Sequence, residues 1–171
     1  GSEDCFSASS EDNGEGVFCI DGLTGEILWQ TDFIPGVWNT ECLRTIGDVN
    51  LDGIQDLAAG TTLPNSVTVF SGVNGEVIWS SSQEYPVKYI ERATGPSPGD
   101  AVVLVLTKLG TDWLIFNGLD GLTGEQVWNN TYSNSSLDEW IKVTDADING
   151  NGWSEMGCSI DRGGAMSGYT T

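Results

Sequence analysis

An eight-residue phrase that occurs three times limits the fold of this chain more than any other feature of its sequence. Each copy reads Gly-x-x-Gly-Glu-x-x-Trp, and the copies occupy residues 22–29, 72–79 and 121–128. The tryptophans that end them, Trp29, Trp79 and Trp128, follow one another at intervals of 50 and 49 residues. A period of about 50 residues filled with short strands is typical of the four-stranded blades of a β-propeller. The repeat therefore predicts an all-β fold.

The second repeat shows the expected strands most clearly. They are predicted over residues 42–46, 57–61, 66–72 and 76–80. Leu63-Pro64-Asn65 forms the turn before the third strand, and in Val73-Asn74-Gly75 the Asn-Gly pair is expected to supply the positive φ angles of a tight hairpin. The same strand order fits residues 89–130 and 140–169, so we expect four-stranded antiparallel blades.

About three and a half such repeats fill the 171 residues, which form a single propeller-repeat domain. The expected division is a partial first blade with strands two to four, two full blades and a partial fourth blade, over residues 1–38, 39–84, 85–134 and 135–171. A closed propeller typically has about four to eight blades, so the ring is expected to be incomplete or completed by another chain. Three arrangements remain open: a piece of a longer propeller, strands borrowed from another copy, or an unusually small ring closed by the end strands.

The charge of the chain excludes some partners. It has 25 Asp and Glu against 6 Lys and Arg, for a formal net charge of −19. Phosphate backbones and anionic membrane surfaces should be repelled, so nucleic acid is not an expected partner. The longest uncharged apolar run, residues 101–106, is too short for a membrane span, and we expect no membrane insertion. Carboxylates that hold cations explain part of the acidity, and solvated surface or a salt-adapted source explains the rest.

Residues 48–56, Asp-Val-Asn-Leu-Asp-Gly-Ile-Gln-Asp, have the pattern of a calcium-binding loop. Oxygen-bearing side chains stand at positions 1, 3, 5 and 9, with glycine at position 6 for the sharp bend. Calcium takes about six to eight oxygen ligands, and alternate residues of a tight loop point at a common centre. The predicted ligands are the side chains of Asp48, Asn50, Asp52 and Asp56 and the carbonyl of Ile54. The loop is not an EF-hand, because Ala59 stands where the glutamate of position 12 belongs.

A second copy of this loop begins at Asp147, 99 residues later. Its predicted ligands are the side chains of Asp147, Asn149, Asn151 and Glu155 and the carbonyl of Trp153. A start at Asp145 is the alternative register, but it places Trp153 at position 9 and loses a carboxylate. The second site has fewer anionic ligands and should bind calcium more weakly. The corresponding residues of the third repeat, 94–100, keep one carboxylate and contain prolines, so no metal is expected there. The alternative for both loops is a pair of Asx-turns without an ion.

Residues 47–60 resemble the FG-GAP repeat of integrin α-subunit propellers and many microbial surface proteins. The resemblance implies that the acidic loop holds calcium between the first two strands of a blade. Residues 21–29 are similar to the quinoprotein-like propeller repeat, in which the tryptophan docks between adjacent blades. Because Trp29, Trp79 and Trp128 recur at one place in the repeat, we expect them to pack between blades.

The cysteines and two sequons point to an oxidising, extracellular location. Four cysteines without CxxC spacing, in a chain without histidine, favour disulfides over a zinc site. Cys5 and Cys19 are expected on neighbouring strands of the first blade, which favours a Cys5–Cys19 bridge and leaves Cys42–Cys158, although three connectivities are possible. Asn129 and Asn134 begin the triplets Asn-Asn-Thr and Asn-Ser-Ser and are predicted glycosylation sites.

These features favour a non-enzymatic, extracellular calcium-binding module, structural or adhesive, which self-assembles through open strand edges as a component of a filament or surface layer. The expected partners are other copies of the chain or further blades of a longer one, with glycans or cell-surface proteins as further candidates. The alternative is a fragment of a larger propeller protein, either a carbohydrate- or protein-binding receptor ectodomain or a quinone-dependent or polysaccharide-cleaving enzyme. The chain has no histidine for general-base catalysis, and its clustered carboxylates already have a metal role, so no catalytic residue is predicted.

Overall fold

The computed structural model describes residues 3–10, 14–31, 42–62, 64–97, 99–110, 113–133 and 137–162. The strands in these residues are β1 (Glu3–Ser10), β2 (Gly14–Asp21), β3 (Ile27–Gln30), β4 (Leu43–Gly47), β5 (Asp56–Thr62), β6 (Asn65–Phe70), β7 (Val77–Ser82), β8 (Val87–Thr94), β9 (Ala101–Leu109), β10 (Trp113–Asp120), β11 (Gln126–Ser133), β12 (Leu137–Ala146) and β13 (Glu155–Arg162). No helix in this part of the chain has the length and apolar character needed to cross a membrane.

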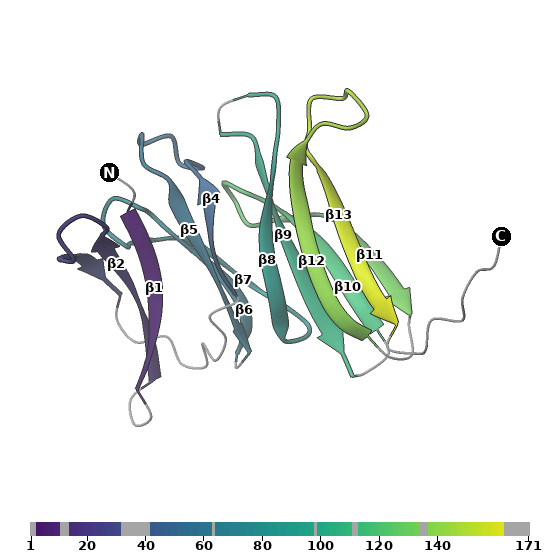
Figure 1. Ribbon diagram of the computed structural model, residues 1–171, viewed down its shortest axis with the longest axis horizontal. Helices are drawn as coiled ribbons and strands as arrows, with labels where there is room; N and C mark the ends of the chain where they lie inside the picture. Colours follow the sequence, from purple (N-terminus) through teal and green to yellow (C-terminus); the bar gives the residue numbers. More distant parts are fainter. Residues whose placement is uncertain are drawn as a thin grey trace.

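The strands form antiparallel sheets in which neighbours in the sequence are neighbours in space. The first sheet contains β1–β3, the second β4–β7, the third β8–β11 and the fourth β12–β13. The sheets stand beside one another in a row (Figure 1). The prediction of an all-β fold with antiparallel four-stranded units is confirmed for the second and third sheets, and over the described residues the sheets do not close into a ring.

The strand bounds of the second sheet lie within two residues of the predicted ones, but one predicted turn is wrong. Between β6 and β7 only Gly75 has a positive φ angle, +74°, whereas Asn74 does not. The loop is wider than a two-residue hairpin, because its hydrogen bonds join Ser71 N–H to Glu76 O and Gly75 N–H to Ser71 O, both at 2.8 Å. Asn74 instead accepts a hydrogen bond from the Glu76 N–H through its side chain. A single left-handed residue at the end of the loop is sufficient for a loop of this length.

The core lies between the sheets. Alternate residues of a strand point to opposite faces of its sheet, and the second sheet buries both faces. Leu57 and Ala59 of β5 pack toward the first sheet, with Val17, while Ala58 belongs to the cluster shared with Val103 of the third sheet. Since apolar burial contributes roughly 25 cal/mol per Å², these inter-sheet layers hold the row together.

The tryptophans of the repeated phrase join one sheet to the next. The indole Nε1 of Trp29 in β3 donates a hydrogen bond to the Gly72 carbonyl of the second sheet at 2.8 Å. Trp79 in β7 donates in the same way to the Gly121 carbonyl of the third sheet, also at 2.8 Å. Both indoles are buried, with 8% of each residue exposed. For these two residues, packing between sheets is therefore confirmed.

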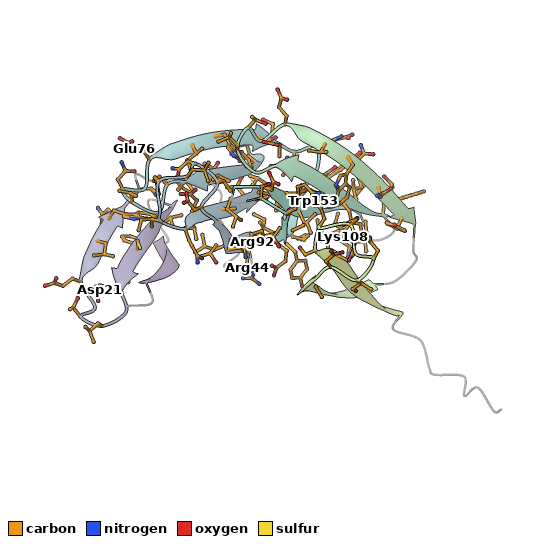
Figure 2. All side chains as sticks on the ribbon, turned by 90° about the horizontal axis from the view of Figure 1, so that it is seen from above. Asp21, Arg44, Glu76, Arg92, Lys108 and Trp153 are labelled. Atoms are coloured by element: carbon orange, nitrogen blue, oxygen red, sulfur yellow. The ribbon has the colours of Figure 1, made fainter. Side chains whose placement is uncertain are left out.

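The row of sheets is curved. Figure 2 shows Arg44 and Arg92 on its concave side and Glu76 on its convex side. Arg44 belongs to β4 and Arg92 to β8, so the first strands of the second and third sheets face the concave side. Arg44 Nε makes an ion pair with Glu91 Oε1 at 3.1 Å, which links these two strands.

Candidate metal centre

The first candidate loop connects β4 to β5 and folds around its own polar side chains. Asp48 accepts main-chain hydrogen bonds through both carboxylate oxygens, Oδ1 from Asp52 at 3.0 Å and Oδ2 from Gly53 at 2.9 Å. Asn50 Oδ1 accepts a bond from the Asp52 N–H at 3.0 Å, and Asp52 Oδ1 accepts one from the Ile54 N–H at 2.9 Å. The side chains at positions 1, 3 and 5 of the loop are thus all engaged with its main chain.

Asp52 also connects the loop to the turn between β6 and β7. Its Oδ2 atom accepts hydrogen bonds from Asn50 Nδ2 at 2.8 Å and from Ser71 Oγ at 3.2 Å. The hydrogen bond from the Ile54 N–H, followed by that from the Asn50 side chain, lowers the pKa of Asp52; burial opposes this effect by more than the Ser71 hydroxyl adds to it. These bonds favour the charged carboxylate that a hard cation requires.

Asp56, the first residue of β5, is the most enclosed carboxylate of the loop, with 0% of its surface exposed. Its Oδ2 atom accepts hydrogen bonds from the N–H groups of Val49 at 2.8 Å and Asn50 at 3.3 Å, and its Oδ1 atom accepts one from Gly72 at 3.1 Å. Burial raises the pKa of Asp56, and the three N–H groups oppose that rise only in part. Burying a charge in this way is costly unless a counter-charge is present.

The third sheet shows that the turn itself does not require this buried carboxylate. Gly121, which corresponds to Gly72, donates its N–H to the main-chain carbonyl of Ala101 at 2.8 Å. By strand pairing, the residue of β9 that corresponds to Asp56 is Val102, which follows Ala101. Because the same turn forms with an apolar residue at this position, the turn alone does not require the carboxylate of Asp56, and binding a cation is one other role for it.

The second candidate loop connects β12 to β13, and its hydrogen bonds follow the register that begins at Asp147. Asp147 Oδ1 accepts bonds from the N–H groups of Gly150 at 2.7 Å and Asn151 at 3.0 Å, and Oδ2 accepts one from Gly152 at 2.8 Å. Asp145, the start of the alternative register, lies within β12. Asp147 therefore holds the same place in its loop as Asp48 does in the first.

The remaining polar residues of the second loop complete the correspondence. Asn149 Oδ1 accepts a hydrogen bond from the Asn151 N–H at 2.9 Å, and Asn151 Oδ1 accepts one from the Trp153 N–H at 2.8 Å. Glu155 accepts bonds from the Ile148 N–H and the Asn149 side-chain amide. Glu155 is only half-buried, and the loop residues before it are largely exposed, so this loop is shallower than the first.

One residue in the first loop has an unfavourable main-chain conformation. Leu51 has a φ angle of +61° and, within the described residues, is the one non-glycine residue with a positive φ. Gly150 occupies the same position in the second loop, with a φ of +78°. The left-handed conformation costs about 1–2 kcal/mol for a residue with a Cβ atom. Sequence reasoning missed this strain, although Gly150 was a signal that could have revealed it.

The residues fit calcium by their chemistry and their order along each loop, but the carboxylates are turned toward main-chain N–H groups. In the part of the chain that the structure describes, no group of three or more His, Cys, Asp or Glu side chains is placed so that it could hold a metal ion. The predicted ligand sets also include side-chain amide and main-chain carbonyl oxygens, which are not among these four residue types. Calcium binding at both loops stays a prediction.

The loop of the third sheet differs from the other two. Its single carboxylate, Asp100, accepts a hydrogen bond from the Ser97 N–H through Oδ2 at 3.0 Å, and its N–H bonds Ser97 O at 3.0 Å. A cavity of about 270 Å³ separates this loop from the first candidate loop, and both Asp48 and Arg92 line it. Sequence reasoning did not place Arg92 there, because the contact joins two sheets.

The structure places the first predicted cysteine pair opposite each other. Cys5 and Cys19 are register partners in the β1–β2 pairing, and Cys19 is buried. Cys42 is also buried, and its Sγ atom donates to the Val87 carbonyl at 3.4 Å. Cys158 is in β13, with Ile141 as its register partner. The Cys5–Cys19 and Cys42–Cys158 bridges both stay predictions.

The first predicted glycosylation site lies within β11. Asn129 is exposed on that strand, which leaves it accessible to modification. Asn134 lies outside the described residues.

Comparison with known proteins provides no family for this chain. No protein-family model matches it, and no curated protein is significantly similar to it. The resemblance to FG-GAP repeats therefore rests on residues 47–60 alone, and the resemblance to quinoprotein-like repeats rests on the tryptophan phrase.

Proposed function

We propose that the chain is a non-enzymatic, extracellular calcium-binding module that acts as a structural or adhesive building block. The observation that carries this proposal is the correspondence between the two acidic loops. Asp48 and Asp147 accept the same main-chain hydrogen bonds, two blade periods apart. The buried carboxylate of Asp56, which the turn does not require, adds to it.

Calcium at the first loop would neutralise carboxylates that otherwise repel one another and would tie β4 to β5. The effect would extend further, because Asp56 bonds Gly72 and Asp52 bonds Ser71, both in the β6–β7 turn. Occupancy would therefore stiffen the whole second sheet. At a free calcium concentration 100 times the Kd, a single site stabilises the folded state by about 2.7 kcal/mol.

The row of sheets is, in this proposal, a set of β-propeller blades of the FG-GAP type. The period of the sheets and the tryptophans that join them support this arrangement. Either another copy of the chain or further blades of a longer chain would extend the row. Opposed cysteines in the first sheet and an exposed sequon at Asn129 support an extracellular location.

Calorimetric titration of calcium into chelator-treated protein tests the proposal. Two sites are expected, the first tighter than the second. Asp52→Asn should weaken the first site by about tenfold or more, since ligand charge sets calcium affinity. Glu155→Gln should weaken only the second.

Asp100→Asn is the matched control, because it makes the same change of charge in the loop for which no metal is predicted. It should leave both affinities unchanged. The proposal is overturned if no calcium-dependent heat is found at millimolar calcium, or if Asp100→Asn weakens binding as much as Asp52→Asn does.

A further inference from the structure

The contact between a tryptophan and the next sheet has two parts, which occur twice in the chain. The first is the hydrogen bond from the indole to a glycine carbonyl, made by Trp29 and Trp79. The second is the packing of the indole against the last glycine of the turn, where there is no side chain in its way. A Cβ atom on Gly75 would lie 2.6 Å from Trp29, and one on Gly124 would lie 2.5 Å from Trp79. We call each such turn a socket.

The first sheet has a third socket, and no residue that the structure describes covers it. The turn between β2 and β3 has the same hydrogen bonds as the other two, with Gly25 N–H bonded to Asp21 O at 2.8 Å. The φ angle of Gly25 is +75°, against +74° at Gly75 and +72° at Gly124. No atom comes within 4 Å of a Cβ placed on Gly25, and 90% of Leu23 in this turn is exposed. The socket is formed but has no indole.

The third sheet has the matching tryptophan without a socket. Trp128 has the position in β11 that Trp29 has in β3, and it packs against the apolar cluster of Leu106 and Phe116. It is only half-buried, whereas 8% of Trp29 is exposed. Among the described residues, no atom accepts a hydrogen bond from its Nε1 group. Within this part of the chain, Trp128 therefore makes neither part of the contact that its two counterparts make with the next sheet, and its indole lies instead against Gly118 of its own sheet.

We propose that Trp128 of one copy docks on the turn of residues 22–25 of a second copy, an inference that rests on the blade arrangement of the proposed function. The socket is in the first sheet and Trp128 is in the third, so the second sheet lies between them (Figure 1). The contact is thus head-to-tail, and such contacts produce a closed ring or an open filament. The occupant is a copy of this chain because the chain forms this interface twice within itself.

The incomplete sheets support the same junction. Within residues 137–162 the fourth sheet has two strands, β12 and β13, and β12 lies against β8 of the third sheet. The first sheet has three strands, and the repeat assigns them to positions two to four of a blade. β1 of one copy and β13 of the other would both occupy the second strand position of a shared blade. If one of these two strands is displaced, the two partial sheets together make one complete four-stranded blade. Each copy then supplies three blades, and two copies supply six, within the range of about four to eight blades of closed propellers.

Sedimentation velocity over a range of protein concentrations tests this docking, at an ionic strength that screens the charge of −19 on each copy. The expected species is a dimer of 18.2 kDa chains, about 36 kDa. Trp128→Phe keeps an apolar ring but removes the indole N–H, and should weaken association by roughly tenfold. Gly25→Asn fills the socket with a residue that tolerates a positive φ angle, and should abolish association.

Gly110→Asn is the matched control. Gly110 also has a positive φ angle, +62°, and open space around it, but it lies between β9 and β10. This variant should associate as the unmodified chain does. A mixture of Trp128→Ala and Gly25→Asn chains keeps one intact junction, so it should associate although neither variant does so alone.

Three results would decide against the docking. The unmodified chain could be a monomer at every concentration, or Gly25→Asn could associate as the unmodified chain does. The third result is that Gly110→Asn loses as much association as Gly25→Asn. If the unmodified chain forms oligomers of more than two copies and Gly25→Asn abolishes them, the docking is supported. The closure of a ring by two copies is then overturned. Calcium titration of the unmodified chain separates this proposal from the proposed function. Intact calcium binding in an unmodified chain that stays monomeric at every concentration would overturn the docking alone.

Discussion

At the scale of single residues, Leu51 is where the first loop departs most from a relaxed conformation. We predict that Leu51→Gly raises the free energy of unfolding by about 1 kcal/mol, because it removes the cost of a Cβ atom at positive φ. Urea unfolding of the calcium-free protein measures this change. Gly150→Ala in the second loop is the reverse experiment and should lower stability by a similar amount. No gain from Leu51→Gly would mean that contacts of the Leu51 side chain outweigh the strain.

Asp21 provides a prediction about pH. The N–H groups of Thr24 and then Leu23, each at 2.8 Å from its Oδ1 atom, hold the pKa of Asp21 below its ordinary value of 3.8. A depressed pKa means that the carboxylate stabilises the fold above pH 3.8, and that this contribution is lost as the pH falls through the lower folded value.

An NMR titration of the Asp21 carboxyl carbon checks this prediction, with an expected midpoint below 3.8. A midpoint at or above that value would contradict it. Asp21→Asn should remove this part of the pH dependence of stability below pH 3.8.

At the scale of strands and turns, sequence periodicity predicted most of what the structure contains. The strands of the second sheet were predictable because β-branched runs and turn residues are local signals. The conformation of the β6–β7 turn was not predictable, since an Asn-Gly pair fits both a two-residue hairpin and the wider loop that ends at Gly75. The contacts of Gly72 with Asp56 and Trp29 were also out of reach, because they join residues far apart in the sequence.

The tryptophan junction is the element-scale feature with the clearest energetic test. Trp79→Ala should lower the free energy of unfolding by about 3–5 kcal/mol, because it empties the space between the second and third sheets. Trp79→Phe should cost less. Trp113, of which 44% is exposed, provides the control, and Trp113→Ala should change stability by about 1 kcal/mol or less. A small effect at Trp79 would mean that the sheets are held by the other core residues alone.

At the scale of the whole molecule, the negative charge makes calcium and ionic strength separable effects. Screening by salt reduces repulsion among all carboxylates, whereas calcium acts at particular loops. A chelator at constant ionic strength should therefore lower the Tm of the calcium-loaded protein by roughly 5–10 °C, the shift that about 2.7 kcal/mol gives in a chain of this length.

Scanning calorimetry with sodium chloride at matched ionic strength checks this prediction. Sodium should not restore the lost Tm. Equal recovery with sodium and with calcium would show that general screening is sufficient.

The overall arrangement was less predictable than the blades themselves. The repeat predicted a row of sheets and predicted that Trp29 and Trp79 join neighbouring sheets, because each copy of the phrase has the same tryptophan and the same turn. It predicted the same contact for Trp128, which the described residues do not show. It could not predict how the row ends, because ring closure depends on surfaces that have no partner within the pattern. The predictability of the candidate calcium loops is intermediate. Their order of oxygen donors was predictable, whereas the comparison of Asp56 with Val102 of the third sheet needed the structure.

Gly72 makes two hydrogen bonds that connect the acidic loop to the neighbouring sheet. Its N–H donates to Asp56 of the loop, and its carbonyl accepts from the indole of Trp29 in the first sheet. A Cβ atom there would lie 1.9 Å from the Gln55 carbonyl oxygen, so no larger residue can take its place. A cation that displaced Asp56 on binding would displace Gly72 too, and with it the carbonyl that accepts the indole hydrogen bond. The emission wavelength of Trp29 should then act as a built-in gauge of ion occupancy, readable one sheet away from where the ion sits.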